Sequence, residues 1–239
     1  MATFVLVHGA WHGGWCWRPV ADRLRAAGHR VFAPTLTGLC DRSHLLTRAV
    51  GLGTHVDDVV NLFEWEEIED AVLCGHSYGG MVIAGAADRA AGRIGALVYL
   101  DAFVPEAGGA LFDLIPPERA EMFRQSAEEH GEGWKVPAPD ARVWVEDTAM
   151  QAWLNAKVTP QPLATMAEAL PATGAQTGIA RRVYVYATEN PVPTFGQFHE
   201  KLRDDPAWDM RTLPTSHDAM LSMPGDVADL LAAATTEND

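Results

Sequence analysis

The sequence has few basic residues, few cysteines and no long hydrophobic run. Its 18 Lys and Arg stand against 32 Asp and Glu, so the formal net charge is −14, and no basic cluster reverses that sign locally. Nucleic acid and anionic membranes would be repelled by such a charge, so we expect neither as a partner.

The three cysteines, Cys16, Cys40 and Cys74, are odd in number and lack metal-ligand spacing. We therefore expect free thiols in a reducing compartment rather than disulfides. No apolar run reaches membrane-spanning length, and no leader-like segment precedes the apolar residues that start at Phe4. Together these absences predict a cytoplasmic protein.

Strand-like apolar runs alternate with helical segments along most of the 239 residues. That alternation is typical of an α/β fold, a mostly parallel sheet with helices on both faces. We expect strands at 4–7, 31–33, 71–74, 96–100, 183–187 and 210–213. We expect helices at 17–27, at 54–65 with Thr54 as N-cap, and at 225–234.

The alternation stops after Leu100 and resumes at Arg182. The interval is rich in aromatic residues and methionine, with helical stretches near 117–130 and 147–156. An insertion at the carboxyl ends of parallel strands lies over the crevice where such sheets bind ligands. We therefore predict a core of residues 1–104 and 180–239 and an inserted cap of residues 105–179.

The segment 71–87 has the pattern of a sharp turn between a buried strand and an apolar helix. Its centre reads GHSYGG, with Ser77 at the apex and glycines on both sides. Glycine is needed where strand and helix nearly touch, and this turn exposes the serine hydroxyl. Ser77 is the predicted nucleophile.

A serine hydroxyl needs a base, usually histidine, and the base needs an acid that fixes its tautomer. His217 follows the last predicted strand and precedes the final helix. Hydrolases whose nucleophile stands on a strand-to-helix turn carry their base late in the chain, at such a place. His8 is expected to stabilise the first loop and His76 to fill the variable position of the motif, while His12 and the remaining histidines lack a comparable context.

The oxyanion of an acyl-transfer reaction needs two preorganised N–H donors. One comes from the residue after the nucleophile, here Tyr78, and the other from the loop after the first strand. In that loop, HGAWHGGW at 8–15, we expect Ala10 to be the donor. No metal or organic cofactor is needed for such a reaction.

Four motifs carry a family resemblance along nearly the whole chain: HGAWHGGWCW at 8–17, GHSYGG at 75–80, KVTPQP at 157–162 and SHDAML at 216–221. They resemble the α/β-hydrolase superfamily, in its branch of hydroxynitrile lyases, plant methylesterases and bacterial carboxylesterases such as pyrethroid hydrolases. The resemblance implies an α/β-hydrolase fold, Ser77 as nucleophile, His217 as base, and a possible homodimer.

The acid departs from the pattern that the resemblance implies. Plant relatives place an Asp just after the penultimate strand, and here that position holds Asn190, with Glu189 one residue earlier. Asp101 directly follows the strand predicted at 96–100, which comes after the apolar helix that begins at the Ser77 turn, and in this position it resembles the acid of haloalkane dehalogenases. We favour Asp101 and keep Glu189 as the alternative.

The residues favour hydrolysis of a small-to-medium hydrophobic or aromatic ester through an acyl-enzyme. Related lyases resemble one another in a Thr and a Lys at positions that hold Gly9 and Asp218 here. Cyanohydrin cleavage is therefore the alternative reaction, and a non-catalytic ligand-binding protein is a third possibility. We expect an apolar substrate site lined by Trp11, Phe103, Trp134, Trp144, Met150 and Trp153.

Overall fold

The computed structural model describes residues 1–190 and 193–235, and it contains one parallel six-stranded sheet in the order β2-β1-β3-β4-β7-β8. The strands are β1 (Thr3–Val7), β2 (Arg30–Phe32), β3 (Ala71–His76), β4 (Ile94–Leu100), β7 (Arg181–Ala187) and β8 (Asp209–Leu213). All six predicted strands are present, and each end lies within two residues of its expected place. The predicted α/β architecture is confirmed.

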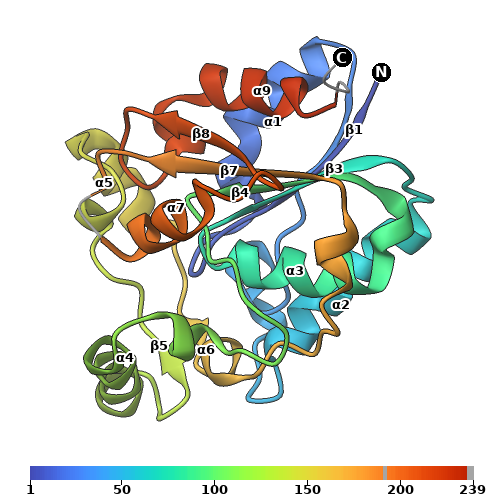
Figure 1. Ribbon diagram of the computed structural model, residues 1–239. Coiled ribbons are helices and arrows are strands. Elements are labelled where there is room, and N and C mark those ends of the chain that lie inside the picture. Colours follow the sequence, from blue (N-terminus) through green and yellow to red (C-terminus); the bar gives the residue numbers. More distant parts are fainter. Residues whose placement is uncertain (191–192, 236–239) are drawn as a thin grey trace.

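Helices cover both faces of this sheet (Figure 1). One face carries α1 (Arg18–Ala26) and α9 (Pro224–Ala233), and the other carries α2 (Leu52–Trp65) and α3 (Gly79–Ala90). The short helices α7 (Gly196–Leu202) and α8 (Ala219–Ser222) flank β8 in the sequence. The prediction that Thr54 caps α2 is wrong: the N-cap is Gly51, and Thr54 Oγ1 accepts a hydrogen bond from the Gly51 amide at 3.4 Å.

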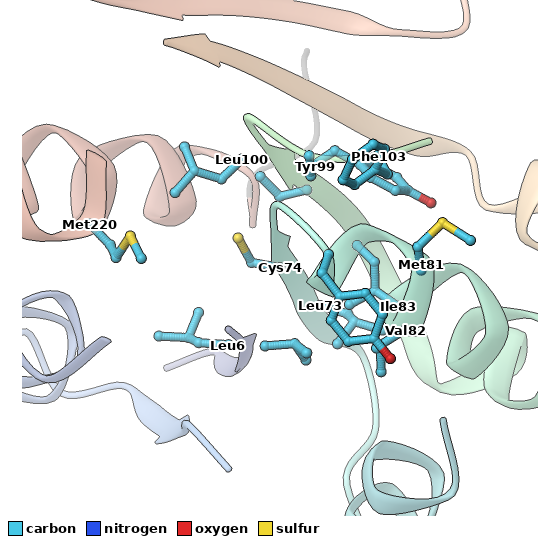
Figure 2. Close-up of a cluster of buried hydrophobic side chains, with 14 of the residues drawn as sticks. Leu6, Leu73, Cys74, Met81, Val82, Ile83, Tyr99, Leu100, Phe103 and Met220 are labelled. Atoms are coloured by element: carbon cyan, nitrogen blue, oxygen red, sulfur yellow. The ribbon is translucent and has the colours of Figure 1, made fainter. Parts of the chain in front are cut away.

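The sheet core is apolar on both faces because successive side chains of a strand point in opposite directions. Figure 2 shows Leu6, Cys74 and Leu100 on the side of Met220. Leu73 and Tyr99 lie on the other side, toward Met81, Val82 and Ile83 of α3. All these side chains are at most 2% exposed, so the middle of the sheet is a rigid support for the loops at its carboxyl ends.

The chain between β4 and β7 lies outside the large sheet. It contains α4 (Pro117–His130), α5 (Thr148–Asn155), α6 (Ala164–Ala167) and an antiparallel pair of β5 (Lys135–Val136) and β6 (Gln161–Pro162). The predicted helices near 117–130 and 147–156 are both present, the second with Asp147 as its N-cap. Among the described helices of the whole chain, none is long and apolar enough to cross a membrane.

Candidate active site

Ser77 occupies the sharp turn between β3 and α3. Its backbone φ is +53°, in the left-handed region that is costly for any residue with a Cβ atom. The glycines make the turn possible, since a Cβ atom on Gly75 would lie 2.6 Å from the Gly79 carbonyl oxygen and one on Gly80 would overlap the Phe103 carbonyl. Ser77 is half-buried, whereas every other residue of 71–87 is buried, so the turn presents only the serine to the outside.

His217 lies in the loop between β8 and α8, and its ring is held on two sides. Its Nδ1 atom donates to Asp101 Oδ2 at 2.7 Å. The Phe195 ring stacks on it with a centroid distance of 4.8 Å and an interplanar angle of 13°. Because Nδ1 donates to the carboxylate, Nε2 is left without a proton and free to act as a base.

Asp101, rather than Glu189, is the carboxylate that meets the histidine. It is fully buried directly after β4, and its Oδ1 atom accepts from the Ala187 amide at 3.3 Å. Asn190 Nδ2 donates to Asp101 Oδ2 at 2.6 Å, so the amide that follows β7 supports this acid. Glu189 is exposed, its backbone amide donates to the Thr215 carbonyl, and within the described residues no hydrogen bond or ion pair joins it to His217.

The two predicted oxyanion donors, Ala10 and Tyr78, flank Ser77 in the same cavity. In the described part of the chain, neither backbone N–H has an acceptor, which leaves both free for an anion. The Ala10 loop is well anchored, because Trp11 N donates to Gln161 Oε1 at 3.0 Å and Trp11 Nε1 donates to the Val136 carbonyl at 3.0 Å.

A cavity of about 200 Å³ opens above these residues, and both Ser77 and His217 line it. Three of the predicted apolar walls, Trp11, Phe103 and Trp144, line it as expected. Further walls that sequence reasoning missed come from the chain between β4 and β7 and from the turn before α7: Leu111, Ile115, Arg119, Met122, Phe123, Pro139, Val143, Met166, Thr194 and Phe195.

The other three predicted walls are wrong. Trp134 does not line the cavity; the Arg48 guanidinium lies over its ring, with Cζ 5.3 Å from the ring centroid. Trp153 is 42% exposed and packs edge-on against Trp15 at 5.1 Å. Met150 borders a separate surface hollow next to Glu189. Their aromatic or apolar character could not tell which side of the insertion faces the cavity.

Two other buried histidines near Ser77 are neutral. Burial lowers the pKa of His8 to about 3, and the ring donates to the Gly9 carbonyl and accepts from the Leu36 amide. This confirms the expected role of His8 in stabilising the first loop. Burial also lowers the pKa of His76 well below its usual range, and its Nε2 donates to the His217 carbonyl oxygen at 3.1 Å. Neither histidine competes with His217 as a base.

His12 has a buried partner that sequence reasoning missed. Its Nε2 lies 3.1 Å from Asp218 Oδ2, and its Nδ1 lies 2.8 Å from the Ala10 carbonyl oxygen. The two residues are 206 positions apart, so no local pattern could have found the pair.

His76, His217 and Asp218 have ligand-type atoms within 4.8 Å of one another. His217 Nδ1 already bonds Asp101, Asp218 Oδ2 bonds His12, and His76 Nε2 donates to the His217 carbonyl, so these three atoms have partners within the protein.

Comparison with known proteins agrees with this geometry. The chain matches the Alpha/beta hydrolase family over residues 4–230. It is 44% identical over 241 residues to the carbendazim hydrolyzing esterase of Nocardioides sp. (strain SG-4G), across 98% of this chain and 99% of that protein. It is 39% identical over 108 residues to the alpha-hydroxynitrile lyase of Arabidopsis thaliana, across 43% of this chain and 40% of that protein.

A solved structure shares the whole fold. The extracellular alpha/beta-hydrolase from a Paenibacillus species has a TM-score of 0.87 and 24% identity, and the match covers 99% of this chain and 100% of that one. That protein is described as sharing structural and functional homology with tobacco salicylic acid binding protein 2. At this identity the likeness concerns the fold alone. The expected fold and family are confirmed: this enzyme belongs to the alpha/beta hydrolase family.

Proposed function

We propose that this enzyme is a serine carboxylesterase that hydrolyses small-to-medium hydrophobic or aromatic esters through an acyl-enzyme on Ser77. Its place among the carboxylic ester hydrolases rests on the Nocardioides esterase, which is 44% identical over almost the entire chain. The observation that carries the mechanism is that Ser77, the Asp101–His217 pair and two amides without an acceptor among the described residues meet at one apolar cavity.

In this mechanism Ser77 Oγ attacks the ester carbonyl carbon while His217 Nε2 takes its proton. The carbonyl oxygen becomes an oxyanion that accepts hydrogen bonds from the Ala10 and Tyr78 amides. The tetrahedral intermediate expels the alcohol, which receives the proton from His217. Water then attacks the acyl-enzyme by the same route, releasing the acid and restoring Ser77. Asp101 stays ionised throughout and stabilises the imidazolium.

Residues 105–179 act as the cap in this proposal, because they supply most of the apolar walls. The cavity of about 200 Å³ is smaller than the roughly 300–1,000 Å³ typical of sites for drug-sized ligands. A short acyl chain or a single aromatic ring therefore suits it, and turnover should decline as the acyl chain lengthens.

Gly9 and Asp218 disfavour cyanohydrin cleavage. Asp218 is fully buried and bonded to His12, so no cation follows the base where the related lyases carry Lys. The match to the Arabidopsis lyase nevertheless makes that reaction the second candidate.

The test is a panel of p-nitrophenyl esters from acetate to decanoate, aryl esters, carbendazim and mandelonitrile. The wild-type enzyme is run beside Ser77→Ala. Ester turnover that requires Ser77 supports the proposal, and cyanide release without ester turnover supports the second candidate. Ester turnover by Ser77→Ala contradicts the covalent mechanism, and binding without turnover favours a ligand-binding protein.

A further inference from the structure

His12 faces a hydrogen-bond acceptor at each ring nitrogen. Nδ1 lies 2.8 Å from the Ala10 carbonyl oxygen, and Nε2 lies 3.1 Å from the Asp218 carboxylate. A carbonyl and a carboxylate have no proton to give, so both ring nitrogens must donate. A neutral imidazole has only one N–H. The geometry thus calls for a histidine that carries both protons.

The charged His12 and Asp218 side chains are buried, and each stabilises the charged form of the other. His12 is 2% exposed and Asp218 is fully buried, and the Trp15 and Trp144 rings pack on the imidazole at 5.5 and 4.7 Å. Burial alone would lower the pKa of His12, but the Asp218 carboxylate raises it above the usual value. Burial alone would raise the pKa of Asp218, but the His12 charge lowers it to about 2.

In residues 1–190 and 193–235, four other titratable groups face the pair, and they leave His12 as its cation: His217 donates to Asp101, burial raises the pKa of the Cys16 thiol well above its usual value, and His8 and His76 are neutral. His8 donates from Nδ1 and accepts at Nε2, so it is neutral. His76 donates from Nε2, while its Nδ1 has no partner among the described residues, so it is neutral as well. Asp218 Oδ1 lies 3.7 Å from His76 Nε2 and forms no hydrogen bond within the described chain.

The pair connects the two loops that the reaction must align. Ala10 carries one proposed oxyanion amide, and its own carbonyl oxygen accepts a hydrogen bond from His12 Nδ1. Asp218 directly follows the base His217, and its backbone amide donates to the Trp144 carbonyl at 3.2 Å. Neither His12 nor Asp218 lines the cavity, so the pair reaches the substrate only through its neighbours.

We infer that the buried His12 imidazolium and Asp218 carboxylate form a positioning pair. The pair holds the Ala10 amide in the correct position relative to Ser77 and His217. This inference rests on the proposed esterase function for its kinetic consequences. The protonation of His12 can be tested without any substrate.

The first measurement is ¹⁵N NMR of His12 in the intact protein, assigned with His12→Gln. Both ring nitrogens should be protonated at pH 7, above the usual histidine pKa of about 6.5, and Asp218→Asn should remove the second proton at that pH. A bare ring nitrogen on His12 at pH 7 in the wild-type protein overturns the inference, whether or not the proposed function is right.

The second measurement is kinetic, with p-nitrophenyl butyrate as substrate. Removing one oxyanion donor costs about 10²–10³ in kcat, so a donor that is only misaligned should cost less, about 10- to 100-fold. We expect that loss in kcat for His12→Gln and Asp218→Asn, with KM changed less than about threefold. Affinity for a trifluoromethyl ketone, whose hemiketal oxyanion uses the same amides, should fall in parallel.

The pH profile separates positioning from general damage. If the imidazolium positions the Ala10 amide, activity should fall as the pH rises through the raised pKa of His12. Without Asp218 the imidazolium loses its proton at lower pH, so this fall in activity should move to lower pH in Asp218→Asn. Asp58→Asn is the matched control, because Asp58 is a partly buried carboxylate that binds Thr37 and Arg42 and does not line the cavity. An unmoved profile and unchanged ketone affinity in Asp218→Asn contradict the positioning role. If the wild-type protein hydrolyses no ester, the esterase proposal fails while the NMR result still decides the charge.

Discussion

Asp101 Oδ2 accepts a hydrogen bond from His217 Nδ1 at 2.7 Å, across 116 positions of the chain. The acid follows β4, and Asn190, which follows the neighbouring strand β7, donates to the same oxygen. Adjacent parallel strands end at the same edge of the sheet, so either strand end can deliver a carboxylate to the histidine. In this chain the carboxylate that meets His217 stands after β4, and an amide that follows β7 donates to it.

Asp101→Asn should lower kcat about 10⁴-fold, because an amide can neither fix the tautomer of His217 nor stabilise its charged form. The comparison is Glu189→Gln, which changes an exposed side chain and should leave kcat within about twofold of wild type. Steady-state kinetics with one short-chain ester suffice. Loss of activity in Glu189→Gln alone would make Glu189 the acid.

The double variant Asp101→Asn/Asn190→Asp exchanges the acid and the amide between the two strand ends. Asn190 Nδ2 already lies 3.2 Å from His217 Nδ1, so a carboxylate in its place is within reach of the ring. We expect the double variant to recover at least about 10-fold of the kcat lost in Asp101→Asn, since a charge-assisted hydrogen bond contributes about 1.5–3 kcal/mol. No recovery in a folded double variant would show that the acid must stand after β4.

The sharp turn at Ser77 was predictable from its motif, because only glycine fits at positions 75, 79 and 80, where backbone segments nearly touch. The strands were likewise predictable from short apolar runs that alternate with helical segments. Most walls from the insertion were not: Trp144 lines the cavity as predicted, whereas Trp134 and Trp153 do not. An aromatic residue there packs equally well on either side, and long-range contacts decide which side faces the cavity.

The free energy of unfolding should fall as the pH drops below 6.5, because buried neutral histidines become protonated when the chain unfolds. Burial lowers the pKa of His8 to about 3 and that of His55 to about 4, so the unfolded chain binds protons that the native protein rejects. Each of these two histidines should lower the free energy of unfolding by about 2 kcal/mol as the pH falls from 6.5 to 5. His12 has the opposite sign: its raised pKa stabilises fully below pH 6.5, and this contribution is lost as the pH rises.

Urea unfolding at pH 7 and pH 5 measures this effect. His55→Gln should reduce the loss by about 2 kcal/mol. His44→Gln, which changes an exposed histidine, should leave it unaltered. An equal pH dependence in wild type and His55→Gln would contradict the assignment of a buried neutral imidazole at position 55.

Arg119 should select substrates that carry a hydrogen-bond acceptor away from the ester. Arg119 lines the cavity, and its guanidinium donates to Thr194 Oγ1 at 2.9 Å and lies over the Phe123 ring. Within residues 1–190 and 193–235 no carboxylate pairs with it. A substrate carboxylate would give this cation its missing partner, which is worth roughly 10- to 100-fold in kcat/KM.

Arg119→Met should therefore lose kcat/KM for monomethyl dicarboxylates and keep it for neutral methyl esters of equal length. Arg124→Met is the control, because Arg124 lies on the same helix but outside the cavity, over Phe112. Equal changes for charged and neutral esters in Arg119→Met would show that Arg119 does not read the charge of the substrate.

The covalent role of Ser77 is tested most directly by mass spectrometry of the acyl-enzyme. Wild-type protein is mixed with excess p-nitrophenyl butyrate and quenched in acid within the first turnover, then digested and mapped. We predict one butyryl group on the peptide that contains Ser77, formed in proportion to the burst of p-nitrophenol and absent from Ser77→Ala. A burst with the acyl group on another residue, or ester turnover by Ser77→Ala at the wild-type rate, would contradict the account.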